Sequence, residues 1–287
     1  MNLRTISLLL ALLGAFVLTG CSENDATTPG ASAPVTAEKD AAEAIATDLG
    51  TDDGGLIDQL SDAVDFTGGV DLGAKSEGEC EGLRDAVYDD VTGTWTITIE
   101  RERGDIDGVP YASFTRIYTL RFLDALGDPQ ERYLVDESFA NTIEFNIVSG
   151  EGLHRTRRVE HTLDELTGQF VITDAHTDMV TINGTYLRSG SHHLENRRFT
   201  RDHASTLNLE LIDVQAPRGS ARDLSEAVSG TVTGTYEATI TFVRGDDYTE
   251  REIYREFTVE LGDGEAVVQM NRNRYRARLK TGELVGE

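Results

Sequence analysis

The chain has 287 residues, and its 51 acidic side chains against 26 basic ones give a formal net charge of −25. Nucleic-acid binding needs a basic face that displaces counterions from phosphates, so this composition argues against nucleic acid as a partner. Anionic membrane surfaces repel such a chain as well, so a membrane attachment has to come from an apolar anchor.

The first twenty residues have the pattern of an export signal. Arg4 supplies a positive charge, residues 6–17 form an apolar stretch, and Leu18-Thr19-Gly20-Cys21 follows. The apolar stretch is shorter than the roughly 20 residues that span a bilayer, and it ends in small residues, as a cleaved signal does. We therefore predict a signal peptide over residues 1–20.

The tetrapeptide at residues 18–21 resembles the lipobox of bacterial lipoproteins. The resemblance covers only the first 21 residues. It implies that the sulfur of Cys21 receives a diacylglycerol, that Cys21 becomes the N-terminus, and that acyl chains such as palmitate anchor the protein. Ser22 stands where an aspartate marks inner-membrane retention in enteric bacteria, which favours the outer membrane. The alternative is an ordinary secretory signal with a coincidental cysteine.

A linker and a short helical segment are expected next. Residues 21–36 are small and polar with two prolines, which predicts a flexible stalk. Residues 37–91 form an acidic helical or irregular segment, with helices over 37–49 and 56–66 separated by a glycine-rich breaker. Cys80 falls in this segment and has no partner once Cys21 is lipidated, so we expect a small filler residue and no disulfide.

Residues 92–287 have the period-two pattern of antiparallel strands. Trp95, Ile97 and Ile99 alternate with threonine and glutamate, and the same alternation recurs over 114–122, 207–211, 235–242 and 253–261. Glycine–aspartate turn signals separate the runs. We predict a mainly β protein: one large antiparallel meander on the order of ten to thirteen strands, either a curved open sheet or barrel-like, with the short N-terminal helical segment.

The strand pattern also hints at internal duplication. The sequence TGTW at 92–95 lines up with TGTY at 233–236, and NGTY at 183–186 is a weaker echo. Either a hairpin unit was duplicated, or long hairpins simply favour threonine, aromatic residues and glycine–aspartate turns.

A run of cations near the C-terminus is the first candidate binding site. In a strand its members share one face about 6.7 Å apart, a spacing suited to phosphate or carboxylate groups of a lipid or an acidic polysaccharide. The run consists of Arg272, Arg274, Arg276, Arg278 and Lys280. The alternative is cross-strand ion pairing with a preceding acidic strand that carries Glu250, Glu252, Glu256 and Glu260.

Histidines and clustered carboxylates are the remaining candidates. Several histidines have acids nearby, which is a plausible ligand set for zinc; the candidate ligands are His161, His176, His192 and His193. No HExxH or comparable spacing supports this, and histidines on the wet face of strands are the alternative. Asp105 with Asp107, and Asp246 with Asp247, lack a complete calcium-loop pattern and indicate turns.

Enzyme signatures such as the G-x-S-x-G elbow or a phosphate-binding glycine loop are absent from the sequence. The leading hypothesis is therefore a lipid-anchored envelope protein without a cofactor, which binds a lipid or polysaccharide ligand or another envelope protein, or helps to organise the envelope. An envelope-polysaccharide hydrolase and a structural scaffold are the alternatives. If the helices cover the apolar face of the sheet, recognition through polar faces is favoured over lipid carriage.

Overall fold

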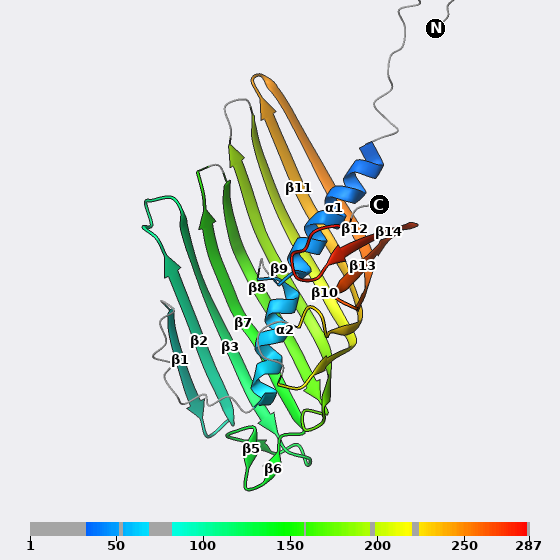
Figure 1. The fold of residues 1–287 in the computed structure, drawn as a ribbon. Helices are drawn as coiled ribbons and strands as arrows, with labels where there is room; N and C mark the ends of the chain where they lie inside the picture. The colour runs from blue at the N-terminus through cyan, green and yellow to red at the C-terminus, as the bar shows by residue number, and fades with distance from the viewer. Residues whose placement is uncertain are drawn as a thin grey trace, which may run out of the picture.

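The computed structural model describes residues 33–51, 54–68, 82–157, 159–195, 199–219 and 224–285. The predicted signal peptide, Cys21 and Cys80 lie outside these ranges. Two helices and one large sheet make up the fold (Figure 1). The helices are α1 (Ala33–Leu49) and α2 (Leu56–Asp65), followed by a 3₁₀ turn, η1 (Phe66–Gly68). The start of α1 lies inside the predicted stalk, and Pro34 is tolerated there because the first helical turn has no backbone partner for its nitrogen.

The sheet is a meander of antiparallel strands. Its strands are β1 (Gly82–Asp89), β2 (Thr94–Arg103), β3 (Tyr111–Leu123), β4 (Pro129–Gln130), β7 (Thr142–Arg155), β8 (Val159–Thr173), β9 (Met179–Glu195), β10 (Thr200–Pro217), β11 (Ser229–Arg244), β12 (Asp247–Gly262), β13 (Glu265–Met270) and β14 (Asn273–Arg278). The short strands β5 (Leu134–Val135) and β6 (Ser138–Phe139) pair only with each other. The predicted mainly β meander is confirmed, and of its two forms the structure has the open sheet, with β1 and β14 at opposite edges. The sheet begins at Gly82, inside the segment predicted to be irregular.

One face of the sheet carries the helices and forms the core. Leu56, Leu60 and Val64 recur every four residues along α2, and all three are fully buried. They pack against strand residues of the predicted apolar parity, such as Ile97 and Phe145. Burying one such side chain contributes about 1.5–3 kcal/mol, so the apolar stripe alone explains why α2 docks. No helix in the described ranges is long and apolar enough to span a membrane.

A polar seam also joins the helices to the sheet. It consists of Asp48, Asp58 and Asp62 from the helices with Arg116 of β3 and Arg188 of β9. Arg116 Nη1 donates to Asp58 Oδ2 at 3.0 Å, and Arg188 Nε lies 3.2 Å from Asp48 Oδ1. Both arginine side chains are buried, so each needs its carboxylate to offset the loss of water. The seam therefore fixes where the helices lie on the sheet.

The helices leave part of their own face uncovered. Figure 1 shows them end to end, with α1 running from the β12 side toward the middle of the sheet and α2 continuing from there. They do not reach the ends of β2, β3, β7 and β8 that lie beside the β2–β3 and β7–β8 turns. This uncovered corner is called the open corner below.

The β14 edge of the sheet is capped by the C-terminal segment. Ala277 forms a bridge with Leu284, and the backbone N–H of Val285 donates to Arg276 O at 2.7 Å. These bonds occupy backbone groups that would otherwise be open to pairing with another strand.

Candidate ligand-binding surfaces

The predicted cationic run lies on β14 and its flanking turns, where three of its members form ion pairs. Arg274 Nη2 lies 2.8 Å from Glu260 Oε2, Arg276 donates to Glu265 through both Nε and Nη2, and Arg278 contacts Glu283 at 4.0 Å. Only Glu260 belongs to the acidic strand named as the alternative; Glu265 and Glu283 were not foreseen. The remaining two cations, Arg272 and Lys280, are exposed. The geometry therefore favours internal pairing over ligand binding for this run.

The four histidines predicted as metal ligands do not come together. His161 and His192 are cross-strand partners on the helix-bearing face, and their rings stack with centroids 3.9 Å apart. His193 follows His192 directly in the chain, so it points to the opposite face, where its Nδ1 lies 2.5 Å from Asp202 Oδ1. His176 lies in the β8–β9 turn, away from the other three.

Two histidines that the sequence analysis did not single out complete a cross-strand row. The register aligns His154 with His161 and His203 with His192, so four histidines follow one another from β7 to β10. Burial, with repulsion from His192, lowers the pKa of His161 to about 3, and burial lowers the pKa of His203 to about 4. His154 and His161 lie at equal distances in the chain from one hairpin turn, and His192 and His203 from another. That symmetric spacing was the sequence signal that could have predicted the cross-strand pairing.

The structure supplies no metal centre from these residues. Among the described residues, no three histidine, cysteine or carboxylate side chains converge as metal ligands would. Asp105 Oδ1 accepts a hydrogen bond from the backbone N–H of Asp107 at 3.1 Å, as a turn requires. Asp246 lies in the β11–β12 turn and Asp247 begins β12. These aspartates therefore fit the turn interpretation.

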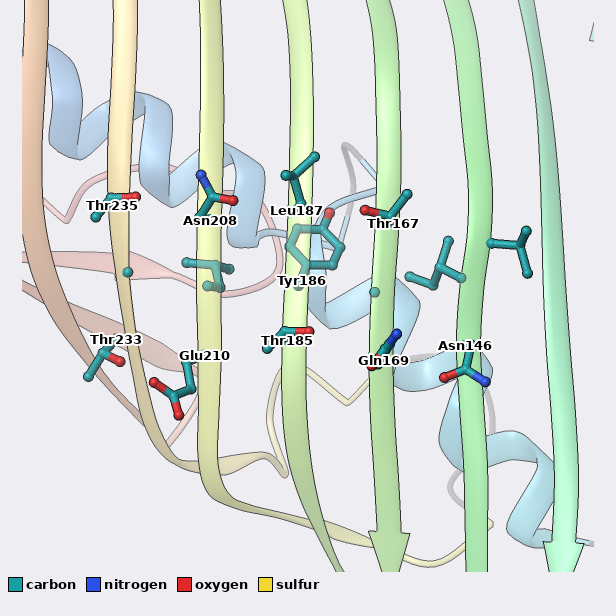
Figure 2. A pocket seen from close by; sticks show the side chains of 15 residues that line it. Asn146, Thr167, Gln169, Thr185, Tyr186, Leu187, Asn208, Glu210, Thr233 and Thr235 are labelled. Atoms are coloured by element: carbon teal, nitrogen blue, oxygen red, sulfur yellow. The ribbon is translucent and has the colours of Figure 1, made fainter.

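The helix-free face carries a long trough that runs across the strands. Figure 2 views this face, with the helices behind the strands, and shows two rows of side chains that flank the trough. The first row consists of Asn146, Gln169, Thr185, Glu210, Thr233, Thr258 and Gln269. The second consists of Thr167, Leu187, Asn208, Thr235 and Glu256. Sequence analysis missed this surface because each strand contributes only one or two residues to it.

The trough is long rather than deep. The part over β7 to β11 has a volume of about 830 Å³, and a second part of about 510 Å³ continues over β12 to β13. The two parts share Thr233, Gly234 and Thr235, so they form one continuous depression. With neighbouring strands about 4.8 Å apart, seven strands give a length of about 29 Å. A shape of this kind suits an extended chain better than a compact molecule.

The trough is nearly uncharged although the protein is rich in charge. Nine of the twelve side chains in the two rows are threonine, asparagine or glutamine, and none is lysine or arginine. The two charged ones are Glu210 and Glu256, which stand on strands separated by β11. Tyr254 lies further along β12, is half exposed, and donates to Glu256 Oε1 at 3.2 Å. Hydroxyl and amide groups that both donate and accept therefore dominate the lining.

Comparison with known proteins identifies no relative. The chain matches no family model, no curated protein and no solved structure.

Proposed function

We propose that this protein is a lipid-anchored envelope protein, favoured for the outer membrane, that binds a linear, uncharged polysaccharide in the trough. The supporting observation is the neutral, hydrogen-bonding lining across seven strands. A polysaccharide presents hydroxyl groups at regular intervals, and threonine, asparagine and glutamine can donate to and accept from them. The anchor is the predicted lipid on Cys21.

The helices cover the core of the sheet, and this supports recognition of a ligand through a polar face. It argues against carriage of a lipid across the whole helix-bearing face. Leu49, Leu56 and Leu60 are fully buried against the sheet, so the part of the apolar face beneath the helices already has its cover. The opposite face is the broad one left to solvent, and its trough is an extended depression that crosses seven strands.

The charges in the trough select against acidic polymers. Glu210 and Glu256 would repel uronate or phosphate groups, and the two rows hold no cation to offset them. We therefore assign the ligand to neutral polysaccharides.

Binding without hydrolysis is supported by the placement of the titratable groups. The histidine row lies on the helix-bearing face and the trough on the other, so the histidines cannot assist a reaction in the trough. Glu210 and Glu256 have β11 between them, which sets their Cα atoms about 10 Å apart across the strands alone. The two trough rows therefore contain two carboxylates from non-adjacent strands and no histidine.

The proposal is tested with the full chain carrying Cys21→Ser, which removes the lipid acceptor and the need for detergent. Affinity electrophoresis through gels containing linear neutral glucans or mannans, with alginate as the acidic comparison, measures retardation. We expect at least one neutral polymer to retard the protein, alginate to have no effect, and added salt to change little, because neutral ligands are not screened.

A matched pair of variants locates the site. Thr185→Tyr places a bulky ring in the middle of the trough, and Thr96→Tyr makes the same change on the same face of β2, outside it. We expect Thr185→Tyr to weaken binding at least tenfold and Thr96→Tyr less than twofold. Equal effects of the two variants, or no retardation by any neutral polymer, would refute the proposal.

A further inference from the structure

A second hollow lies in the open corner, on the face opposite the trough. It has a volume of about 540 Å³, within the range of small-molecule sites. Strands β2, β3, β7, β8 and β9 form its floor, and Gly54, between α1 and α2, borders it. Because it lies on the other face, the inference drawn from it is independent of the polysaccharide proposal.

The floor of this corner pocket combines an apolar row with His154 and His161, and Glu102 and Ser113 also line the pocket. Phe114 of β3, Gly152 of β7 and Leu163 of β8 are cross-strand neighbours in one row. Phe114 and Leu163 are half-buried, and Gly152 between them has no side chain, which lets Phe114 lie close to its backbone. Phe114 and Leu163 line the pocket and are only partly buried, so part of their apolar surface is open to a ligand.

Arginines surround the apolar row. Phe114 lies between two guanidinium groups, with Arg101 Cζ 5.5 Å and Arg116 Cζ 4.8 Å from the ring centroid. Arg103 stands two residues beyond Arg101 on the same face of β2, and Arg188 forms the far wall. Four guanidinium groups around one pocket are unexpected in a chain with about twice as many acids as bases.

Two of these arginines have no ion-pair partner among the described residues. Arg101 pairs in the sheet with Gly82 and Phe114, and Arg103 pairs with Ala112, so neither has a carboxylate opposite it. By contrast, Arg116 and Arg188 are held by the aspartates of the polar seam. The Nε atom of Arg116 is nevertheless buried without a hydrogen-bond partner. Two guanidinium groups without an ion-pair partner among the described residues therefore line the mouth of the pocket.

From this arrangement we infer that the corner pocket binds an anionic amphiphile, a molecule with an apolar body and a carboxylate or phosphate head. The apolar body lies on Phe114, Gly152 and Leu163. The head lies at the mouth, where Arg101 and Arg103 donate charge-assisted hydrogen bonds to its oxygens. The two parts of the pocket engage different parts of the ligand: the apolar body gains contact with Phe114 and Leu163, and the head gains Arg101 and Arg103. An amphiphile that uses both parts therefore binds more tightly than a free anion or a neutral lipid.

The inference is tested by isothermal titration of the full chain carrying Cys21→Ser. The probes are dodecanoate and dodecyl phosphate below their micellar concentrations, with dodecanol and inorganic phosphate as the two incomplete ligands. We expect at least one anionic amphiphile to bind at least tenfold more tightly than dodecanol and inorganic phosphate. Equal binding of dodecanol would make the pocket a neutral lipid site, equal binding of inorganic phosphate would make it a free-anion site, and either result would overturn the inference.

Matched variants separate the head from the body of the ligand. Arg101→Gln with Arg103→Gln should weaken binding of the anionic amphiphile at least tenfold and leave dodecanol unchanged. The control, Arg244→Gln with Arg272→Gln, removes the same charge from exposed positions at the end of β11 and in the β13–β14 turn and should have less than a twofold effect. Similar losses in both double variants, or no binding of any amphiphile, would refute the site. Neither outcome bears on polysaccharide binding, which Thr185→Tyr tests on the other face.

Discussion

Replacing Arg188 with methionine should destabilise the protein strongly, because it leaves a carboxylate without its partner inside the polar seam. The Arg188 side chain is 6% exposed and that of Asp48 is 16% exposed, so water cannot replace the lost contact. The variant also removes the hydrogen bond from Arg188 Nη1 to Gly54 O at 3.0 Å. Breaking one side of such a buried pair costs about 3–5 kcal/mol.

Urea unfolding at pH 7, followed by circular dichroism, measures this change in the free energy of unfolding. Arg274→Met is the matched control, because the Arg274–Glu260 pair is more than half exposed and should cost less than about 1 kcal/mol. The double variant Arg188→Met with Asp48→Leu should recover most of the loss, since it leaves no unpaired charge. If Arg188→Met costs no more than Arg274→Met, the seam does not hold the helices as described.

Three further predictions concern the helices and the anchor. Leu60→Ala should lower the free energy of unfolding by about 2–5 kcal/mol in urea titrations, because Leu60 is fully buried. A loss below about 1 kcal/mol would mean that α2 does not pack against the sheet as described. Burial, with repulsion from Asp58, raises the pKa of Asp62 to about 6, so its protonation adds stability that is complete below pH 4 and lost as the pH rises through 6. After allowance for solvent screening, Asp62→Asn should remove about 1 kcal/mol of the difference in the free energy of unfolding between pH 4 and pH 7. An unchanged dependence of that free energy on pH would contradict this. In bacterial fractionation with radiolabelled palmitate, Cys21→Ser should abolish labelling and release the protein from membranes, and labelling that persists would exclude Cys21 as the lipid site.

Local patterns in the sequence were enough to predict the architecture. Trp95 and Ile97 alternate with polar residues because a strand buries one parity, and Leu56 and Leu60 recur every four residues because a helix buries one stripe. Both patterns act over a few residues, so a reader of the sequence can recover them. The open form of the sheet was not decided at that level, because closure depends on whether β1 and β14 meet.

The candidate sites depend on alignment between strands, which local patterns do not specify. His192 and His193 are adjacent in the chain but lie on opposite faces, and a register shift between Leu163 and Glu165 changes which residues face each other across β8 and β9. The chain by itself determined the strands, the helices and the prediction of an anchor at Cys21. Only the tertiary structure decided that threonines from separate strands line one trough and that Phe114 lies between arginines in the open corner, because these side chains become neighbours only through cross-strand register and the extent of helix cover.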